Sequence, residues 1–316
     1  MRSTCLIVAL IAGLSARTAY AEVPRVVTDI PPVHSLVSAV MQEVGEPALL
    51  VRTAVSVHSN ALRPSEAGAL EAADLVFWMG PELTPWLEKP ISVLPANAEI
   101  VELLDAEGIV RLEFRETEVF DTHGGHDDHD DHDDHDKHGH DEHDHTGVDP
   151  HAWLDPDNAR VWLSLIAERL AASDPENAAL YRLNSEAAQS EIDSMTAELE
   201  TELEPLRGSG FIVFHDAYQY FETRFGLTVS GAIADGDAAD PGPARVAALR
   251  DYIRAEGTRC LLSEPQMRSG LAETVLEGTE ARIATVDPIG STLDPGPDLY
   301  TGLLRGFAAS LRECLS

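Results

Sequence analysis

The feature that most constrains the fold is an alternation of short apolar runs with amphipathic stretches, repeated in two groups along 316 residues. The short runs are rich in valine, isoleucine, leucine and phenylalanine, which favour buried strands. Buried strands that alternate with helices indicate parallel sheets covered by helices on both faces. The sequence therefore predicts an α/β fold with two lobes. Strands are expected at 25–30, 49–55, 75–79 and 100–104, and again at 211–214, 227–230, 260–263 and 283–286.

Four amphipathic stretches are predicted as helices that cover these sheets, at 33–44, 64–73, 243–256 and 298–315. A fifth, longer helix is predicted between the two groups of strands. Asp174 is its expected N-cap, and Pro175 fits its first position. Apolar residues then recur every three to five positions and predict one buried stripe along a rigid linking helix. These residues are Leu180, Leu183, Ala187, Ile192, Met195, Leu199 and Leu203.

The first 21 residues differ from the rest of the chain. Arg2 precedes an apolar run at 5–14, which is followed by a small-residue cleavage site at 19–21. This layout predicts a secretory signal peptide, since the apolar run is too short to span a bilayer. We therefore expect an exported, periplasmic protein that begins near Glu22. Its predicted parts are a first lobe at 22–172, the linking helix at 173–206 and a second lobe at 207–316.

The net charge limits the classes of binding partner, and the cysteines predict a disulfide. The formal net charge of −33 at pH 7 repels nucleic acid and anionic lipid and attracts cations. Two cysteines follow the predicted signal peptide, Cys260 and Cys314. An even number of cysteines in an oxidising compartment usually pairs, so we expect a disulfide, with two separate thiols as the alternative.

The segment 121–147 is unlike any other part of the chain. It holds nine of the thirteen histidines and eleven acidic residues with almost no apolar side chains, so it cannot bury a core. Imidazoles interleaved with carboxylates bind zinc, copper or nickel at several weak sites, which predicts an auxiliary metal-binding loop. Its histidines are His123, His126, His129, His132, His135, His138, His140, His143 and His145.

Four histidines lie elsewhere in the chain. His58 follows the second predicted strand, His215 follows the fifth, and His151 stands in a proline-bounded turn. Because ligands of parallel α/β sheets bind beyond the carboxyl ends of strands, we expect these three imidazoles to converge on one zinc ion. Asp287 follows the last predicted strand and is the expected fourth ligand. The remaining residue, His34, is expected to form hydrogen bonds at the edge of the cleft.

Six short motifs give the chain a specific resemblance to the metal-receptor proteins of bacterial zinc and manganese ABC importers. They are H-S-N-A-L-R-P-S at 58–65, A-D-L-V-F-W-M-G at 73–80, D-P-H-A-W-L-D-P at 149–156, F-H-D-A-Y-Q-Y-F at 214–221, S-E-P-Q at 263–266 and V-D-P-I-G at 286–290. They are spread along the chain in the family's order, so the resemblance extends over nearly all of the chain after the predicted signal peptide. The resemblance implies two α/β lobes joined by a backbone helix, with one metal ion in the cleft between the lobes.

The resemblance also implies ligands, metal and partners. His58 and His151 would bind the ion from the first lobe and His215 from the second. Manganese and iron receptors of the family place a carboxylate at this third position, whereas zinc receptors place histidine, the softer ligand that suits Zn2+. Zinc receptors also carry an acidic, histidine-rich loop, and water can replace Asp287 in them. We therefore expect a monomeric zinc receptor whose partners are the membrane permease of a zinc ABC transporter and periplasmic zinc chaperones.

Three other functions stay open on the sequence alone. A manganese receptor or surface adhesin shares the resemblance, and a periplasmic zinc buffer or chaperone would bind the same metal. A zinc hydrolase would use a three-histidine site to activate water, with Glu264 or Asp287 as the proton-transfer group. The sequence contains no H-E-x-x-H motif, nucleophile elbow or glycine-rich phosphate loop, so a binding protein is expected and an enzyme is not.

Overall fold

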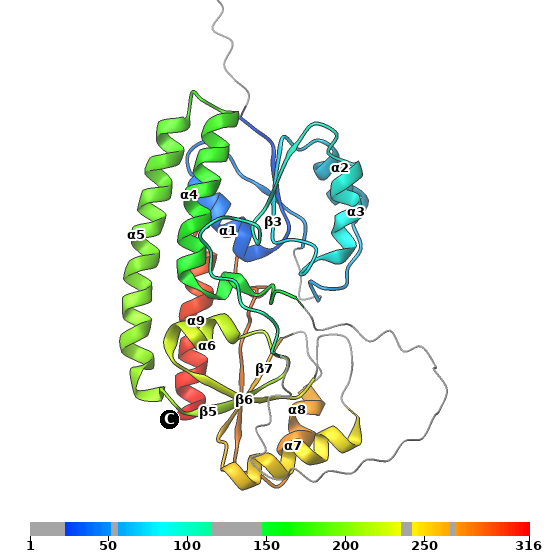
Figure 1. Ribbon diagram of the computed structural model, residues 1–316, viewed down its shortest axis with the longest axis vertical. Helices are drawn as coiled ribbons and strands as arrows, with labels where there is room; N and C mark the ends of the chain where they lie inside the picture. The colour runs from blue at the N-terminus through cyan, green and yellow to red at the C-terminus, as the bar shows by residue number, and fades with distance from the viewer. Residues whose placement is uncertain (1–22, 52–55, 116–146, 235–241, 266–268) are drawn as a thin grey trace, which may run out of the picture.

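The chain folds around two parallel sheets, as a computed structural model of it shows for residues 23–51, 56–115, 147–234, 242–265 and 269–316 (Figure 1). Each sheet has four strands, in the orders β2-β1-β3-β4 and β6-β5-β7-β8, so the two sheets share one topology. This arrangement confirms the predicted α/β class. The strands are β1 (Val26–Thr28), β2 (Ala48–Leu49), β3 (Leu75–Trp78), β4 (Glu99–Glu102), β5 (Gly210–Val213), β6 (Thr228–Ala232), β7 (Cys260–Ser263) and β8 (Arg282–Thr285).

Every predicted strand has a counterpart within one or two residues, except that β2 is shorter than expected and the end of its predicted range, 52–55, lies outside the described residues. The central strands β1, β3 and β5 are buried along almost their whole length. They consist mainly of valine, leucine, isoleucine and aromatic residues, because a strand covered on both faces needs apolar side chains on both. The apolar content of these strands thus fixes where the sheets lie.

Nine helices and two short 3-10 turns are present in the described part of the chain. Five of the helices begin with proline, whose missing N–H is not needed in the first turn. The patterns above predict α1, α2, α5, α7 and α9 but not α3, α4, α6 or α8. The helices are α1 (Pro31–Val40), α2 (Pro64–Glu71), α3 (Pro85–Val93), α4 (Pro156–Ser173), α5 (Ala178–Leu203), α6 (Gln219–Phe225), α7 (Pro243–Glu256), α8 (Ser269–Leu276) and α9 (Leu299–Leu315), and the turns are η1 (Ala152–Leu154) and η2 (Glu204–Leu206).

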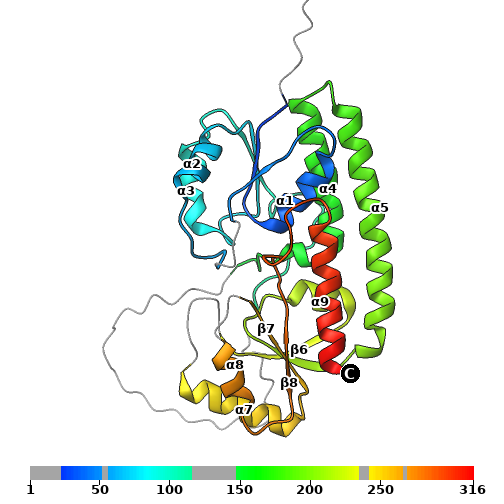
Figure 2. The same cartoon turned by 180° about the vertical axis from the view of Figure 1, so that it is seen from behind.

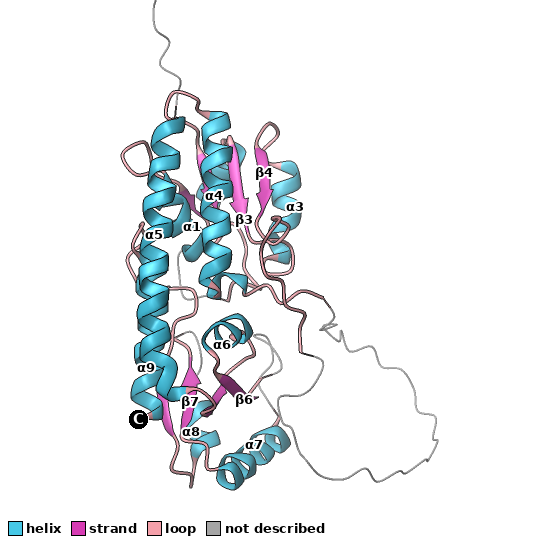
Figure 3. Ribbon diagram, turned by 60° about the vertical axis from the view of Figure 1, so that its left-hand side comes forward, coloured by secondary structure: helices cyan, strands magenta, loops and turns pink. Residues whose placement is uncertain are grey.

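The predicted start of the linking helix is wrong. Helix α5 begins at Ala178, and Asp174 is the buried residue that ends α4. The Asp174 carboxylate accepts hydrogen bonds from Asn177 Nδ2 at 2.7 Å and from the Tyr181 hydroxyl at 3.0 Å. It therefore joins α4 to α5 as a sharp corner, and the two helices lie side by side (Figure 3). The linking helix is half of a helical hairpin and not a lone strut.

The predicted stripe of α5 is correct only in its second half. Ile192, Met195, Leu199 and Leu203 are buried, whereas Leu183 is 61% exposed. In the first half the buried side is carried by Tyr181 and Ser185, together with half-buried Ala188, and Ala187 points to solvent. Steps of 3.6 residues back from Ile192 reach these positions, so one face of the helix is buried along its whole length. The apolar pattern alone does not locate this face in the first half, because some of the buried residues there are polar.

Helix α9 connects the two lobes at the back of the molecule (Figure 2). At its start Ser35 Oγ of α1 donates a hydrogen bond to Pro297 O at 2.9 Å and accepts one from Tyr300 N at 3.0 Å. At its end Cys314 forms a disulfide with Cys260 of β7, which confirms the predicted pairing. One hydrophobic cluster runs through α1, α4, α5 and α9 into both sheets, so the lobes share a core along this side.

Two sequence predictions fall outside the described residues, namely the signal peptide at 1–21 and the nine histidines from 123 to 145. In the described part of the chain, none of the helices combines the length and the apolar content that a membrane crossing requires. The lobe boundaries at 22–172 and 207–316 stay predictions.

Candidate metal centre

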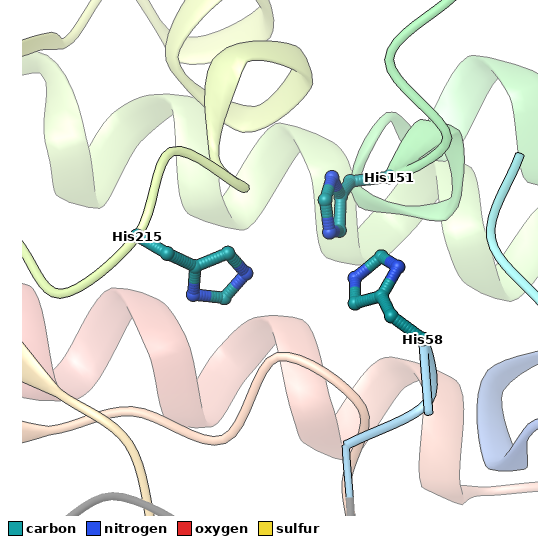
Figure 4. Close-up of side chains that lie close together, drawn as sticks. All are labelled: His58, His151 and His215. Atoms are coloured by element: carbon teal, nitrogen blue, oxygen red, sulfur yellow. The ribbon is translucent and has the colours of Figure 1, made fainter. Parts of the chain in front are cut away.

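The three predicted histidines lie together between the sheets (Figure 4). One nitrogen atom from each of His58, His151 and His215 lies within 4.8 Å of the other two. His58 is in the loop after β2, His151 directly precedes η1, and His215 lies two residues beyond β5. Among the described residues this is the one group of three or more histidine, cysteine or acidic side chains with that spacing.

The rings of the group meet edge to face. The ring centroid of His151 is 5.5 Å from that of His58 and 5.5 Å from that of His215. His151 and His215 are 5% and 6% exposed, and His58 is half-buried. The apolar side chains of Val57, Trp153 and Ile289 line the same small pocket. Water therefore has restricted access to two of the three imidazoles.

Asp149 orients His151. Its Oδ1 atom lies 2.7 Å from His151 Nδ1 and also accepts the backbone N–H of His151 at 3.0 Å. A carboxylate on one ring nitrogen fixes the proton there and leaves Nε2 with the lone pair that a metal ion needs. Sequence reasoning did not assign this role to Asp149, although an acid two residues before a histidine in a proline turn is a usable signal.

Glu264 is the carboxylate that lies beside His215. Its Oε1 atom lies 2.8 Å from His215 Nδ1 and accepts a hydrogen bond from the Tyr218 hydroxyl at 2.7 Å. Glu264 is the first residue after β7 and is 3% exposed, so its charge is shielded from solvent. The sequence indicated Glu264 only as a possible proton-transfer group, and the structure places it behind an imidazole.

His58 is positioned by contacts of its own loop. Its backbone N–H donates to Ser56 Oγ at 3.3 Å. The indole of Trp86, at the start of α3, donates its Nε1 hydrogen to Val57 O at 2.8 Å and so anchors the preceding residue. No sequence pattern pointed to Trp86, because its contact depends on how α3 packs against this loop.

The turn that carries His151 is fixed on both sides. Asp155 caps α4 by accepting the N–H of Asp157 at 2.9 Å, and Pro156 occupies the first helical position. The buried indole of Trp153 donates to Pro288 O at 2.7 Å, in the segment that follows β8. The Tyr300 hydroxyl donates to Trp153 O at 2.8 Å. The turn therefore touches both lobes two residues after the histidine.

The structure does not bring Asp287 into the histidine group. Its Oδ2 atom accepts hydrogen bonds from Thr292 N at 2.7 Å, Thr292 Oγ1 at 2.8 Å and Ser291 Oγ at 3.1 Å. Asp287 therefore closes its own turn in this structure. A role as fourth ligand stays a prediction.

His34 forms hydrogen bonds, as predicted, and does not join the group. It lies on α1, where its Nε2 atom is 3.2 Å from Pro47 O and its Nδ1 atom is 3.4 Å from Ser38 Oγ. Both nitrogen atoms thus have partners within the first lobe.

The arrangement fits one tetrahedral zinc ion. Zinc–imidazole bonds of about 2.0–2.1 Å place nitrogens of a tetrahedron about 3.4 Å apart. The observed upper limit of 4.8 Å needs only small side-chain movements to reach that spacing. Three imidazoles, two of which have a carboxylate oxygen within 2.8 Å of Nδ1, favour a borderline metal such as Zn2+ over the harder Mn2+.

Comparison with known proteins identifies the group of relatives. Residues 26–314 match the family described as zinc-uptake complex component A, periplasmic. The chain is 45% identical over 330 residues to the High-affinity zinc uptake system protein ZnuA of Brucella suis biovar 1, covering 100% of this chain and 99% of the relative. It is 46% identical over 322 residues to the protein of the same name from Paracoccus denitrificans, with 100% and 99% covered.

Solved structures share the fold at lower identity. A crystal structure of ZnuA superposes with a TM-score of 0.75 at 21% identity and covers 93% of this chain and 100% of that chain. The structure of FpvC from Pseudomonas aeruginosa in complex with Mn2+ gives a TM-score of 0.74 at 18% identity and covers 93% and 99%. The fold is thus shared by ZnuA and by a protein in complex with Mn2+, so the metal must be argued from the side chains.

Proposed function

The chain belongs to the family of periplasmic components of zinc-uptake complexes, and from this premise we propose that it captures one Zn2+ ion between its lobes and delivers it to an ABC-type import permease. The observation that carries the proposal is the convergence of His58, His151 and His215 from three separate segments. Residues 1–21 would direct export to the periplasm and would then be removed. The ion is the transported substrate and not a catalytic cofactor.

The choice of zinc rests on the third ligand. His215 supplies an imidazole from the second lobe, with Glu264 behind it. A carboxylate in place of His215 would give the harder ligand set that suits manganese. The three-imidazole group supports zinc over manganese without reference to any relative.

We infer that water fills the fourth position of the tetrahedron. The Asp287 carboxylate accepts hydrogen bonds from Ser291 and Thr292 in its own turn. Glu264 faces His215 and Tyr218. Neither acid has to give up these partners if a solvent molecule completes the shell.

A binding role is favoured over hydrolysis by the same contacts. A general base must reach the metal-bound water and be available to take its proton. The two acids considered for that role, Glu264 and Asp287, have other partners in this structure.

The nine histidines between 123 and 145 are proposed to collect zinc weakly near the cleft, since a chain of imidazoles imposes no single geometry.

Calorimetry on three proteins tests the proposal. They are the chain from residue 22 onward, the same chain without 121–145, and the shortened chain with His215→Ala. The expected result is several weak sites plus one tight site in the first, one tight site in the second, and none in the third. Loss of all tight binding when 121–145 are removed would instead indicate a histidine-rich metal buffer.

A further inference from the structure

Two short segments that flank the histidine-rich region pair with each other close to the metal centre. We name them the clasp, residues 112–115 and 147–149. Glu113 and Val148 form an antiparallel bridge. Phe114 N donates to Gly147 O at 2.9 Å, and Asp149 N donates to Leu112 O at 2.8 Å. The second segment ends two residues before His151, so its position affects where that ligand lies.

The clasp extends from the first lobe and docks on α6 of the second lobe, where the teal chain after β4 runs down to that helix in Figure 1. The Tyr220 hydroxyl accepts the N–H of Leu112 at 3.0 Å and donates to Asp149 O at 2.8 Å. Gln219 Nε2 donates to Glu113 O at 3.2 Å. One helix of the second lobe thus binds both segments of the clasp.

Arg115 provides the charged contact of this junction. Its guanidinium pairs with Glu222 and lies 3.2 Å from Asp216 Oδ2. Its Nε atom also donates to Gln219 Oε1 at 3.2 Å. Asp216 directly follows the ligand His215, so the cation of the first lobe contacts the segment that carries the ligand of the second.

The carboxylates around Arg115 depend on it. The side chain of Glu222 is 7% exposed and that of Asp216 is 26% exposed. Burial raises the pKa of Glu222, and Arg115 opposes that rise. Asp149 also interacts electrostatically with Arg115. Without the guanidinium, acids from both sides of the cleft would face one another without a compensating charge, which favours separation of the segments.

We propose that Arg115 is a positioning residue for zinc capture, which fixes the distance between His151 and His215 by joining the clasp to α6. The proposal rests on the proposed zinc-binding function of these histidines. Arg115 does not contact either imidazole, so it acts through Asp149 on one side and Asp216 on the other. Its loss lowers the fraction of molecules in which the two ligands are close enough to share an ion.

The test compares zinc binding of the full-length mature chain with that of Arg115→Ala and Arg115→Lys. Partners that orient ligands typically contribute 10–100-fold to metal affinity, so Arg115→Ala should weaken the tight site by about that factor, mainly through faster dissociation. Arg115→Lys keeps the charge without the planar fork and should recover part of the loss. Chelator competition with less than one equivalent of zinc measures the affinity, and stopped-flow transfer to chelator measures the release.

Arg224→Ala is the matched control. Arg224 lies on the same helix α6, its side chain is 28% exposed, and it bridges two acids, Asp157 and Glu200. Its partners lie on α4 and α5 and not on the clasp, so its removal should lower the thermal midpoint of the zinc-free protein and change zinc release less than Arg115→Ala does.

The outcomes separate the two proposals. Faster zinc release in Arg115→Ala than in Arg224→Ala, partly restored in Arg115→Lys, supports the positioning role. Equal release rates in all four proteins, with one tight zinc site retained, would refute the positioning role and leave the proposed function intact. Absence of a tight site in the parent protein would refute the proposed function itself. If Arg115→Ala does not fold, Arg115→Lys decides the question, since unchanged release there would also refute the role.

Discussion

The two lobes use the same sheet topology but close the carboxyl end of the sheet in different ways. Each has a buried carboxylate there, Asp29 just after β1 and Glu264 just after β7. In the first lobe the Asp29 oxygens accept backbone N–H groups from Ile30 and Met79, each at 2.8 Å. In the second lobe Glu264 faces His215 and Tyr218 instead.

The two carboxylates follow different central strands, since β7 corresponds to β3 and not to β1, and they show how a buried acid at a strand end acquires a structural or a binding role. Backbone donors satisfy Asp29, and the first lobe supplies its ligands from longer connections, at His58 and His151. In the second lobe the ligand His215 lies two residues after the end of β5, where it faces Glu264. The role of a buried carboxylate is therefore decided by the donor that meets it.

The largest expected effect is on the stability of the second lobe, which alone among the described parts of the chain contains a disulfide. Replacing both Cys260 and Cys314 by serine opens a loop with a sequence separation of 54. The chain-entropy relation predicts a loss of about 4 kcal/mol in the free energy of unfolding. Denaturant titration measures it, and hydrogen exchange should place the loss in β7, β8 and α9. Equal loss of protection in β1 and β3 would contradict the distinction between lobes.

The second prediction concerns Asp29 and pH. Burial raises the pKa of Asp29 to about 7 in the folded protein, against 3.8 as the ordinary value. A raised acid pKa gives stability that is fully present below about pH 4 and is lost as pH rises through about 7. Between pH 5 and pH 9 this group should cost about 2–3 kcal/mol.

Asp29→Asn tests that assignment, because an amide cannot titrate. Denaturation at several pH values should show a shallower decline of stability above pH 5 in the variant than in the parent protein. Zinc affinity at fixed pH should stay the same, since Asp29 does not contact the histidines. An unchanged pH profile would mean that Asp29 is ionised in the folded protein.

Glu264→Gln should change zinc affinity and not stability, the opposite of Asp29→Asn. Glutamine keeps the size of the side chain and an acceptor for Tyr218, but it removes the charge beside His215. Zinc affinity should fall about 10–100-fold, or about 1.4–2.7 kcal/mol, with little change in the thermal midpoint of the zinc-free protein. Chelator competition measures the affinity. A variant that loses stability and keeps its affinity would make Glu264 a structural acid like Asp29.

The smallest effect is expected at Trp86, which anchors the loop of His58. Trp86→Phe removes one hydrogen bond to Val57 O, worth about 1 kcal/mol, so zinc affinity should fall about fivefold. Trp162→Phe is the control, because its indole donates to Leu103 O inside the first lobe. That variant should lose stability without losing affinity. Equal affinities in the two variants would mean that the Trp86 contact does not position His58.

Much of the fold was predictable because the central strands are buried on both faces. Runs such as 75–79 and 211–214 are short and almost entirely apolar, which favours a buried strand, and their positions agree with β3 and β5. Helix α4 was not predicted, since its first residues belong to the proline-bounded turn of His151. The phase of α5 was misjudged because buried Tyr181 is tied to Asp174 by a polar contact that a hydrophobic pattern does not register.

The histidine group was predictable for a topological reason, and its partners were not. Loops at the carboxyl ends of parallel strands meet, so His58, His151 and His215 could be expected to converge. The contacts of Glu264 and Arg115 depend on the packing of elements far apart in the chain, such as α6 on the clasp. The turn that holds Asp287 is likewise visible only in three dimensions.

X-ray absorption at the zinc edge tests the central claim most directly, with one equivalent of Zn2+ bound to the protein that lacks 121–145. The proposed site predicts a four-coordinate ion with three imidazoles and one oxygen, and two imidazoles for the ion that stays bound at the weakened site of His215→Ala. Fewer than three imidazoles in the parent protein, or a spectrum that His215→Ala leaves unchanged, would contradict the assignment of the cleft as the zinc site.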